Sequence, residues 1–206
     1  MTVCIVGHKG NMGRRYASIL NYLGEDWVGI DEGYEIPFMQ NYIIATPTKT
    51  HIDIILDIKI VNPDATILCE KPITTDIKQF RRVPEEYWND IFMVNQYAYI
   101  SDFVNKSWAP ASTFYDFYHS GNDGLAWDCI QLIHLAIEKH KIILRNTSPI
   151  WKAEINGRPI GKEEIDFSYI DMIKDFLGDR KKCWGLHKAY QAHEDVMDYL
   201  CGDSKK

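Results

Sequence analysis

Two charged residues and a proline directly follow an apolar run in the segment Thr66-Ile67-Leu68-Cys69-Glu70-Lys71-Pro72. Short apolar runs of this kind are typical of buried strands in parallel sheets. Burial of Glu or Lys is costly unless the charge is paired or used, and open α/β sheets bind ligands at the carboxyl ends of their strands. Glu70 and Lys71 are therefore candidates for a charged pair presented to a ligand. The alternative is an ordinary charged exit from a strand.

A glycine-rich loop lies near the N-terminus, inside a pattern of strand, loop, helix and strand. Residues 2–6 and 27–31 are β-branched and apolar, and residues 14–23 carry apolar side chains at helical spacing. The loop between them is Gly7-His8-Lys9-Gly10-Asn11-Met12-Gly13. In this context glycines allow the backbone to approach a pyrophosphate, whose charge faces the N–H groups at the helix start. The alternative is a turn that only packs a helix on a sheet. The predicted cofactor contacts in this loop are Gly7, Gly10, Asn11 and Met12.

Asp31 ends the second predicted strand, where a carboxylate would accept hydrogen bonds from a ribose diol. Its negative charge would repel a 2′-phosphate, so NAD is favoured over NADP. Lys9 would attract that phosphate, so NADP remains possible. Residues 32–40 are too few for another strand and helix and show no clear helical spacing. We therefore expect a sheet that is abbreviated on the adenosine side.

A second turn is expected at the same edge of the sheet. Residues 41–45 predict a strand, and Thr46-Pro47-Thr48-Lys49-Thr50-His51 follows, with Thr50 as the expected cap of the next helix. A right-handed crossover would bring this turn to the carboxyl edge, beside the glycine loop. His51 taken alone is more often an ordinary residue at a helix start. The predicted cofactor contacts in this turn are Thr46, Pro47, Thr48 and His51, with Glu70 joining them from the next strand end.

Taken together, the glycine loop, the Thr-Pro…His turn and Glu70-Lys71-Pro72 resemble the Gfo/Idh/MocA oxidoreductases, named after glucose–fructose oxidoreductase and inositol dehydrogenase. The resemblance implies an α/β fold with a Rossmann domain in residues 1–97. A small α+β domain with an open, mostly antiparallel sheet would occupy residues 98–206. It also implies NAD(P) as cofactor and hydride transfer on a hydroxyl or carbonyl of a small sugar- or polyol-like substrate. Lys71 would lie beside the nicotinamide and the substrate oxygen, and Pro72 would follow a cis peptide.

Residues 121–128 resemble the family's glycine-rich turn and helix, which carries an Asp and a His four residues later. Asp128 matches the Asp, but the later position is Leu132. Gln131 shares the helix face of Asp128, whereas His134 lies about a third of a turn or more away. The catalytic candidates are Lys71 and Asp128, and the substrate candidates are Gln131, His134 and Tyr118, the last in the strand-like segment 113–119. Two hypotheses follow: an NAD(P)-dependent oxidoreductase, or a catalytically impaired nucleotide-binding or assembly protein that keeps the fold.

The composition narrows the remaining possibilities. The 206 residues carry a net charge of −6 with acids and bases mixed, which argues against a nucleic-acid partner. No apolar stretch approaches the ~20 residues that cross a bilayer, and the N-terminus lacks the features of a signal peptide. The five cysteines form no Cys-x-x-Cys pair and no His pair has i, i+4 spacing, so we predict no metal site. We expect a cytoplasmic homodimer that acts on a small molecule and associates through the second-domain sheet.

The other expected elements complete the two domains. Residues 75–83 predict a helix with a threonine cap, and residues 91–95 the last strand of the first domain. Residues 151–157 predict a strand that ends in an Asn-Gly turn. Two amphipathic helices are expected, one from Asp166 to Gly178 and one over residues 186–200, followed by a loose tail from Gly202.

Overall fold

The protein is described by a computed structural model in which the chain forms two compact units, each made of two separate pieces. The first unit joins Met1–Val94 to Ile173–Tyr190, and the second joins Asn95–Met172 to Gln191–Lys206. The predicted division of the chain at residue 97 stays a prediction. The structure describes residues 2–33, 35–100, 113–116, 127, 130–131, 133–134, 142–145, 152–155 and 158–203.

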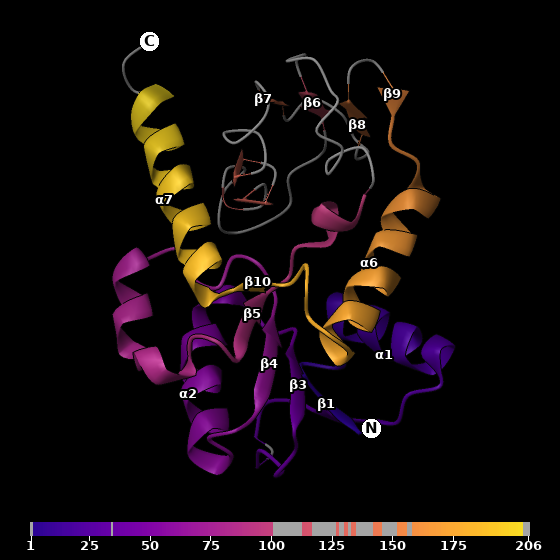
Figure 1. Ribbon diagram of the computed structural model, residues 1–206, viewed down its shortest axis with the longest axis vertical. Coiled ribbons are helices and arrows are strands. Elements are labelled where there is room, and N and C mark those ends of the chain that lie inside the picture. The colour runs from indigo at the N-terminus through magenta and orange to yellow at the C-terminus, as the bar shows by residue number, and fades with distance from the viewer. Residues whose placement is uncertain are drawn as a thin grey trace. The chain divides into compact units, whose positions relative to one another are not determined.

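The first unit is built on a six-stranded, mostly parallel sheet with the order β10-β5-β4-β3-β1-β2. Figure 1 labels the strands of this sheet from β10 to β1. Strands β1, β3, β4 and β5 are buried along their whole length, as their mainly apolar sequences predict. Only β10 runs antiparallel, and it pairs with β5. The expected α/β fold with an abbreviated parallel sheet is thus confirmed. The strands are β1 (Val3–Val6), β2 (Trp27–Ile30), β3 (Asn41–Ile44), β4 (Thr66–Cys69), β5 (Ile91–Met93) and β10 (Trp184–Gly185).

Helices α1 (Asn11–Leu23) and α2 (His51–Val61) flank this sheet (Figure 1). The chain crosses from β1 to β2 in one direction and from β3 to β4 in the other. Because such crossovers are right-handed, the two helices pack on opposite faces. The change of direction makes the gap between β1 and β3 the topological switch point, where open α/β sheets bind their ligands.

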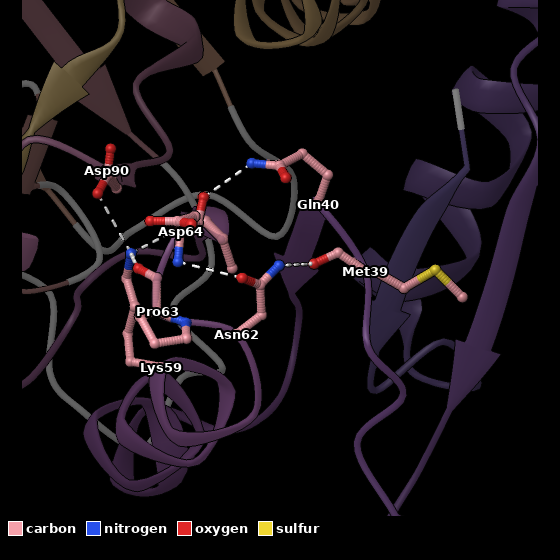
Figure 2. A network of polar contacts seen from close by, with 8 residues as sticks. Met39, Gln40, Lys59, Asn62, Pro63, Asp64 and Asp90 are labelled. Carbon is pink, nitrogen blue, oxygen red and sulfur yellow. Dashed lines mark hydrogen bonds and ion pairs between the residues drawn. The ribbon is translucent and has the colours of Figure 1, made fainter.

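A buried lysine holds the amino-terminal edge of the sheet. Lys59, near the end of α2, has a side chain that is 1% exposed. Its Nζ donates to Pro63 O at 2.8 Å and to Ala65 O at 2.7 Å, and lies 3.3 Å from Asp90 Oδ2 (Figure 2). All three ammonium donors therefore have an acceptor. Burial lowers the pKa of Lys59, and the nearby Asp90 carboxylate opposes that shift.

Two amides extend this edge network toward β3. Asn62 Nδ2 donates to Met39 O at 2.7 Å, and Gln40 Nε2 donates to Asp64 O at 2.7 Å (Figure 2). These bonds join the end of α2 to the segment that leads into β3. The amino-terminal edge is thus held by side chains that bond to backbone carbonyls of the connecting loops.

The start of α2 differs from the prediction. The Thr50 hydroxyl makes no capping hydrogen bond to the helix; it donates to Pro47 O at 2.8 Å and lies 2.9 Å from Thr46 Oγ1. The reason is a 3₁₀ turn, η1 (Thr48–Thr50), which precedes α2 and turns Thr50 back toward the preceding residues. Thr50 thus holds the expected N-cap position of α2, but its side chain does not make the expected capping hydrogen bond.

The segment after β4 also differs. Residues Ile77–Arg82 form a 3₁₀ helix, η2, instead of the expected helix over 75–83. The cap is Asp76, whose carboxylate accepts from Lys78 N at 3.0 Å. An aspartate is a good N-cap acceptor, and it lies one residue beyond the threonine that the sequence suggested.

The last piece of the first unit comes from two long helices and the strand between them. Helix α6 (Lys162–Leu177) begins four residues earlier than expected, and α7 (Leu186–Asp203) extends into the predicted tail. Aromatic contacts attach this piece: Phe176 lies 6.2 Å from Phe92 between ring centroids, and Tyr190 lies 5.4 Å from Phe80. Strand β10 between the helices has no counterpart in the sequence-based prediction, because two residues carry no periodicity.

The second unit contains a four-stranded sheet with the order β7-β6-β8-β9. Strand β6 pairs with β7 in parallel and with β8 antiparallel, and β9 pairs with β8 antiparallel. The described residues between 127 and 134 are helical. Within the described part of the chain, no helix is long and apolar enough to cross a bilayer. The strands are β6 (Thr113–Asp116), β7 (Ile142–Arg145), β8 (Lys152–Ile155) and β9 (Arg158–Pro159).

Candidate functional site

The carboxyl ends of the parallel strands lie level with one another. The register aligns Val6 with both Ile30 and Ile44, and Ile44 with Cys69. Three predicted loops therefore start side by side: the glycine loop after β1, the Thr46 turn after β3 and the Lys71 turn after β4. Backbone hydrogen bonds extend this alignment by one residue, from Gly7 N to Ile30 O (2.8 Å), Ala45 N to Val6 O (2.8 Å), Glu70 N to Ile44 O (2.9 Å) and Val94 N to Cys69 O (2.8 Å).

The glycine loop leaves no room for side chains at its two ends. Gly7 has φ +87°, and a Cβ there would lie 2.9 Å from Ala45 O. A Cβ on Gly13 would lie 2.2 Å from Gly7 O. Gly10 is less constrained, with a Cβ contact of 3.3 Å to the same oxygen. The loop thus folds tightly onto itself and onto the neighbouring strand end, which presents its backbone at the switch point.

Helix α1 begins directly at this loop. Gly10 is its N-cap and makes no side-chain capping bond, and the first turn of the helix carries no acid. Arg14 Nη2 donates to Asn11 Oδ1 at 2.6 Å, and Arg14 Nη1 donates to Lys9 O. The start of the helix dipole and a guanidinium therefore lie together at the loop. This arrangement favours an anion, and Arg14 is a residue to which the sequence pattern assigned no role.

Asp31, the predicted ribose ligand, follows β2 and contacts the glycine loop. His8 Nδ1 lies 2.9 Å and Lys9 Nζ 3.4 Å from Asp31 Oδ2. The sequence indicated the carboxylate and the lysine but assigned no function to His8. A histidine inside a glycine loop carries no local signal, because its partner is on another strand.

His51 connects the Thr46 turn to the Lys71 turn from inside the fold. Its side chain is buried, with only 1% of the residue exposed. Nε2 lies 2.8 Å from Thr46 O and Nδ1 lies 3.0 Å from Pro72 O. Burial lowers the pKa of His51, while the two carbonyls and the charge of Glu70 act in the opposite direction. His51 was predicted to contact the cofactor. Its buried ring instead contacts the backbone of the two turns and positions Thr46 and Pro72.

Glu70 braces the turn that carries Lys71. Tyr16 Oη donates to Glu70 Oε1 at 2.5 Å, and Lys71 N donates to Glu70 Oε2 at 3.1 Å. Glu70 is only 7% exposed, whereas Lys71 is half-buried. The Lys71–Pro72 peptide is cis, as the family resemblance implied. Tyr16 was expected only as an apolar residue of α1, and its bond to Glu70 could not be read locally because the two are distant in sequence.

The buried cysteines of β1 and β4 are unsuited to nucleophilic chemistry. Burial raises the pKa of the Cys4 thiol to about 12 and also raises that of Cys69. Both cysteines are therefore neutral thiols and poor nucleophiles at neutral pH. No cluster of three or more metal-ligating side chains occurs among the described residues.

The two described substrate candidates lie in buried polar contacts of the second unit. Gln131 Nε2 donates to Gln96 Oε1 at 2.8 Å, and His134 Nδ1 lies 2.5 Å from Asp195 Oδ2. Both residues are almost fully buried. Asp195 lies on α7, and the sequence assigned it no role. The other two candidates of this unit, Asp128 and Tyr118, lie outside the described residues.

Comparisons with known proteins identify the fold. No family model and no curated protein matches the chain. Among solved structures, the WlbA (WbpB) dehydrogenase from Thermus thermophilus, in complex with NAD and UDP-GlcNAcA, is 12% identical with a TM-score of 0.71. That match covers 95% of this chain and 93% of the other.

Two inositol dehydrogenases match the chain with the same sequence identity and slightly lower TM-scores. A myo-inositol dehydrogenase from Corynebacterium glutamicum is 12% identical, with a TM-score of 0.67 and coverage of 95% and 94%. The scyllo-inositol dehydrogenase from Lactobacillus casei, with bound cofactor NAD(H) and scyllo-inositol, is 12% identical, with a TM-score of 0.65 and coverage of 96% and 95%. Identity at this level carries the fold and not the activity. The chain has the fold of the Gfo/Idh/MocA-type dehydrogenases.

Proposed function

We propose that the chain binds NAD or NADP at the carboxyl edge of the first unit's sheet and transfers a hydride to or from a small sugar- or polyol-like substrate. One observation carries this proposal. The glycine loop after β1 and the Lys71 turn after β4 begin at the same level of the sheet, on either side of the Thr46 turn. The dehydrogenases with the same fold include complexes with NAD and with inositol.

The residues at this edge fit a dinucleotide. The tight turn at Gly7 and Gly13 brings the loop backbone to the strand end, and the N-terminus of α1 would face a pyrophosphate there. Thr46 and Thr48 would line the adjacent part of the cofactor, and Asp31 would bind the adenosine ribose. A bound nicotinamide would supply the hydride acceptor or donor.

Lys71 is the proposed catalytic residue. Both carboxylate oxygens of Glu70 already accept hydrogen bonds, from Tyr16 and from the Lys71 backbone. Glu70 thus fixes the backbone from which the Lys71 side chain extends. In the direction of carbonyl reduction, the ammonium would hydrogen-bond the substrate oxygen and give it a proton as the hydride arrives, and oxidation would run this transfer in reverse. Such acid–base help contributes about 10²–10⁴-fold in rate. The assignment of Asp128 as a second catalytic residue stays a prediction.

Calorimetric titration and turnover assays test this proposal together. The unmodified protein should bind NAD or NADP and reduce it with at least one member of a panel of sugars and polyols. Lys71→Ala should lose turnover by about 10²-fold or more and still bind the dinucleotide. Lys78→Ala is the matched control, because Lys78 is an exposed lysine of η2. Unchanged turnover in Lys71→Ala would rule out the catalytic role, and no binding of either dinucleotide would rule out the function.

A second candidate function is dinucleotide binding without catalysis. Leu132 stands where the family pattern has its histidine. The nearby polar residues Gln131 and His134 make buried contacts with Gln96 and Asp195. Dinucleotide binding without turnover of any sugar or polyol in the panel would favour this alternative.

We further propose that the chain forms a homodimer through the sheet of its second unit, because an open sheet needs its outer face covered. Light scattering at working concentration would then give twice the chain mass of 24.0 kDa. A monomeric mass would contradict the proposal and would leave the proposed activity untouched.

A further inference from the structure

An imidazole and an ammonium of the glycine loop converge on the carboxylate expected to bind ribose. His8 Nδ1 lies 2.9 Å from Asp31 Oδ2, and Lys9 Nζ lies 3.4 Å from the same oxygen. The Lys9 backbone N–H reaches the other oxygen, Oδ1, at 3.5 Å. We call these three residues, His8, Lys9 and Asp31, the adenosine-end cluster. The carboxylate is therefore not presented as an isolated negative charge.

Part of this cluster is shielded from water and poorly bonded. His8 Nδ1 and Asp31 Oδ2 are both inaccessible to solvent, and neither has a hydrogen bond of acceptable geometry within the described residues. Their contact is close but misaligned, so it is mainly electrostatic. Buried polar atoms are normally bonded. An exception at the expected ribose position indicates that these groups reorganise around a ligand.

The position of the His8 ring depends on a glycine in the neighbouring strand. A Cβ on Gly29 of β2 would lie 2.3 Å from Cγ and 2.7 Å from Nδ1 of His8. The ring of Trp27 lies 6.3 Å away on the same strand. The imidazole thus fills the space above Gly29, and any side chain at that position would displace it from Asp31.

Charge decides which dinucleotide such a site accepts. A lone aspartate repels the 2′-phosphate of NADP, which is the usual basis of NAD selectivity. Here the Lys9 ammonium cancels the charge of Asp31, and the imidazole adds a further donor. Lys9 is also 68% exposed, so its ammonium can turn from the carboxylate to a phosphate at little cost.

We infer that His8 and Lys9 determine the cofactor choice of this chain, and that the site accepts NADP with an affinity within about tenfold of that for NAD. With NAD, the two side chains hold Asp31 toward the ribose diol. With NADP, they become the partners of the 2′-phosphate. This inference rests on the proposed function, because it requires a dinucleotide at the glycine loop.

The test is calorimetric titration of NAD and NADP against the full chain and three variants. Lys9→Met keeps the length of the side chain but removes its charge, and should weaken NADP about tenfold while changing NAD by less than about threefold. Asp31→Asn should weaken NAD and leave NADP unchanged or tighter. His8→Gln should weaken NADP relative to NAD, and Lys78→Met, an exposed lysine on η2, should change neither.

Gly29→Ala provides an independent check, because it displaces the His8 ring without changing any charged residue. It should reproduce the effect of His8→Gln on the ratio of the two dissociation constants. If NAD binds but NADP binds more than about a hundredfold more weakly, and Lys9→Met leaves that ratio unchanged, the inference is overturned and the proposed function stands. If neither dinucleotide binds, both are overturned.

Discussion

The two edges of the parallel sheet use their buried polar side chains in opposite ways. At the amino-terminal edge, Lys59 satisfies all three of its donors with two loop carbonyls and Asp90. At the carboxyl edge, His8 Nδ1 and Asp31 Oδ2 are buried and lack a well-formed hydrogen bond. A fully satisfied network stabilises the fold, whereas unsatisfied polar atoms are tolerated where a ligand completes them.

This contrast teaches that polarity and burial alone do not identify a site. Lys59 is more deeply buried than Lys71 and has a clearly perturbed pKa. Perturbed groups are often functional, yet the contacts of Lys59 show a structural role. All three donors of Lys59 are bound to the connecting loops and Asp90, so variants at the two edges should separate stability from binding.

The largest effect is expected at the amino-terminal edge. Lys59→Met should lower the free energy of unfolding by about 3 kcal/mol, because Pro63 O and Ala65 O lose their buried donor. Urea titration of this variant and of Lys78→Met measures the difference. Dinucleotide affinity below the melting temperature should be unchanged, and a parallel loss of affinity would break the contrast between the edges.

The glycine loop should show a smaller loss of stability combined with a loss of binding. Gly13→Ala places a Cβ 2.2 Å from Gly7 O and should cost about 2 kcal/mol. The distorted loop should also bind the dinucleotide poorly. Gly10→Ala is the control for stability, since its Cβ contact of 3.3 Å requires only a small adjustment. Equal unfolding free energies for the two variants would contradict this account of the loop.

The hydrogen bond between Tyr16 of α1 and Glu70 can be removed by deleting one oxygen atom. Tyr16→Phe deletes the hydroxyl that donates to Glu70 Oε1, and should lower the free energy of unfolding by about 1 kcal/mol. Because Glu70 also holds the Lys71 backbone, kcat should fall while the dissociation constant of the dinucleotide stays the same. Tyr22→Phe, an exposed tyrosine on the same helix, should change neither quantity.

The effect confined to acidic pH is the dependence of stability on the ionisation of His51. Burial lowers its pKa in the folded state, so the unfolded chain binds more protons between that lowered pKa and the ordinary value of about 6.5. Stability should therefore fall as the pH decreases from 7 through this window, by at most about 1.4 kcal/mol per pH unit from this group.

Unfolding measured over a pH series tests this dependence. His51→Gln should flatten the slope, and His187→Gln, an exposed histidine at the start of α7, should leave it as it is. The opposite result would be that the unmodified protein gains more stability than His51→Gln as the pH falls. In that case the folded state would prefer a protonated His51. The two carbonyls and Glu70 would then outweigh burial, and the expected direction of the pH dependence would be wrong.

The first unit was largely predictable because its signals are local. Apolar runs marked the five parallel strands, glycines marked the loop after β1, and Glu70-Lys71-Pro72 marked the turn after β4. These patterns reflect burial of strands and backbone geometry, which act on neighbouring residues. The cis peptide before Pro72 came from the family resemblance and is also present.

The contacts that organise the site were not predictable in the same way. The Tyr16–Glu70, His8–Asp31 and His51–Pro72 contacts each join residues that are far apart in sequence. The side-chain bond expected from the Thr50 cap is missing for a related reason, since the 3₁₀ turn before α2 turns its hydroxyl to Pro47 O. Residue types suggest which side chains can bond, but only the fold determines which of them meet.

Strand β10 has a consequence for how the protein is made. Its residues pair with β5 although they lie far beyond it in the chain. During synthesis at about 5–20 residues per second, the β5 edge therefore stays open for on the order of ten seconds before its partner leaves the ribosome. An open apolar edge is a site of mispairing, so slower translation or truncation before Trp184 should expose the nascent chain to aggregation and to chaperones.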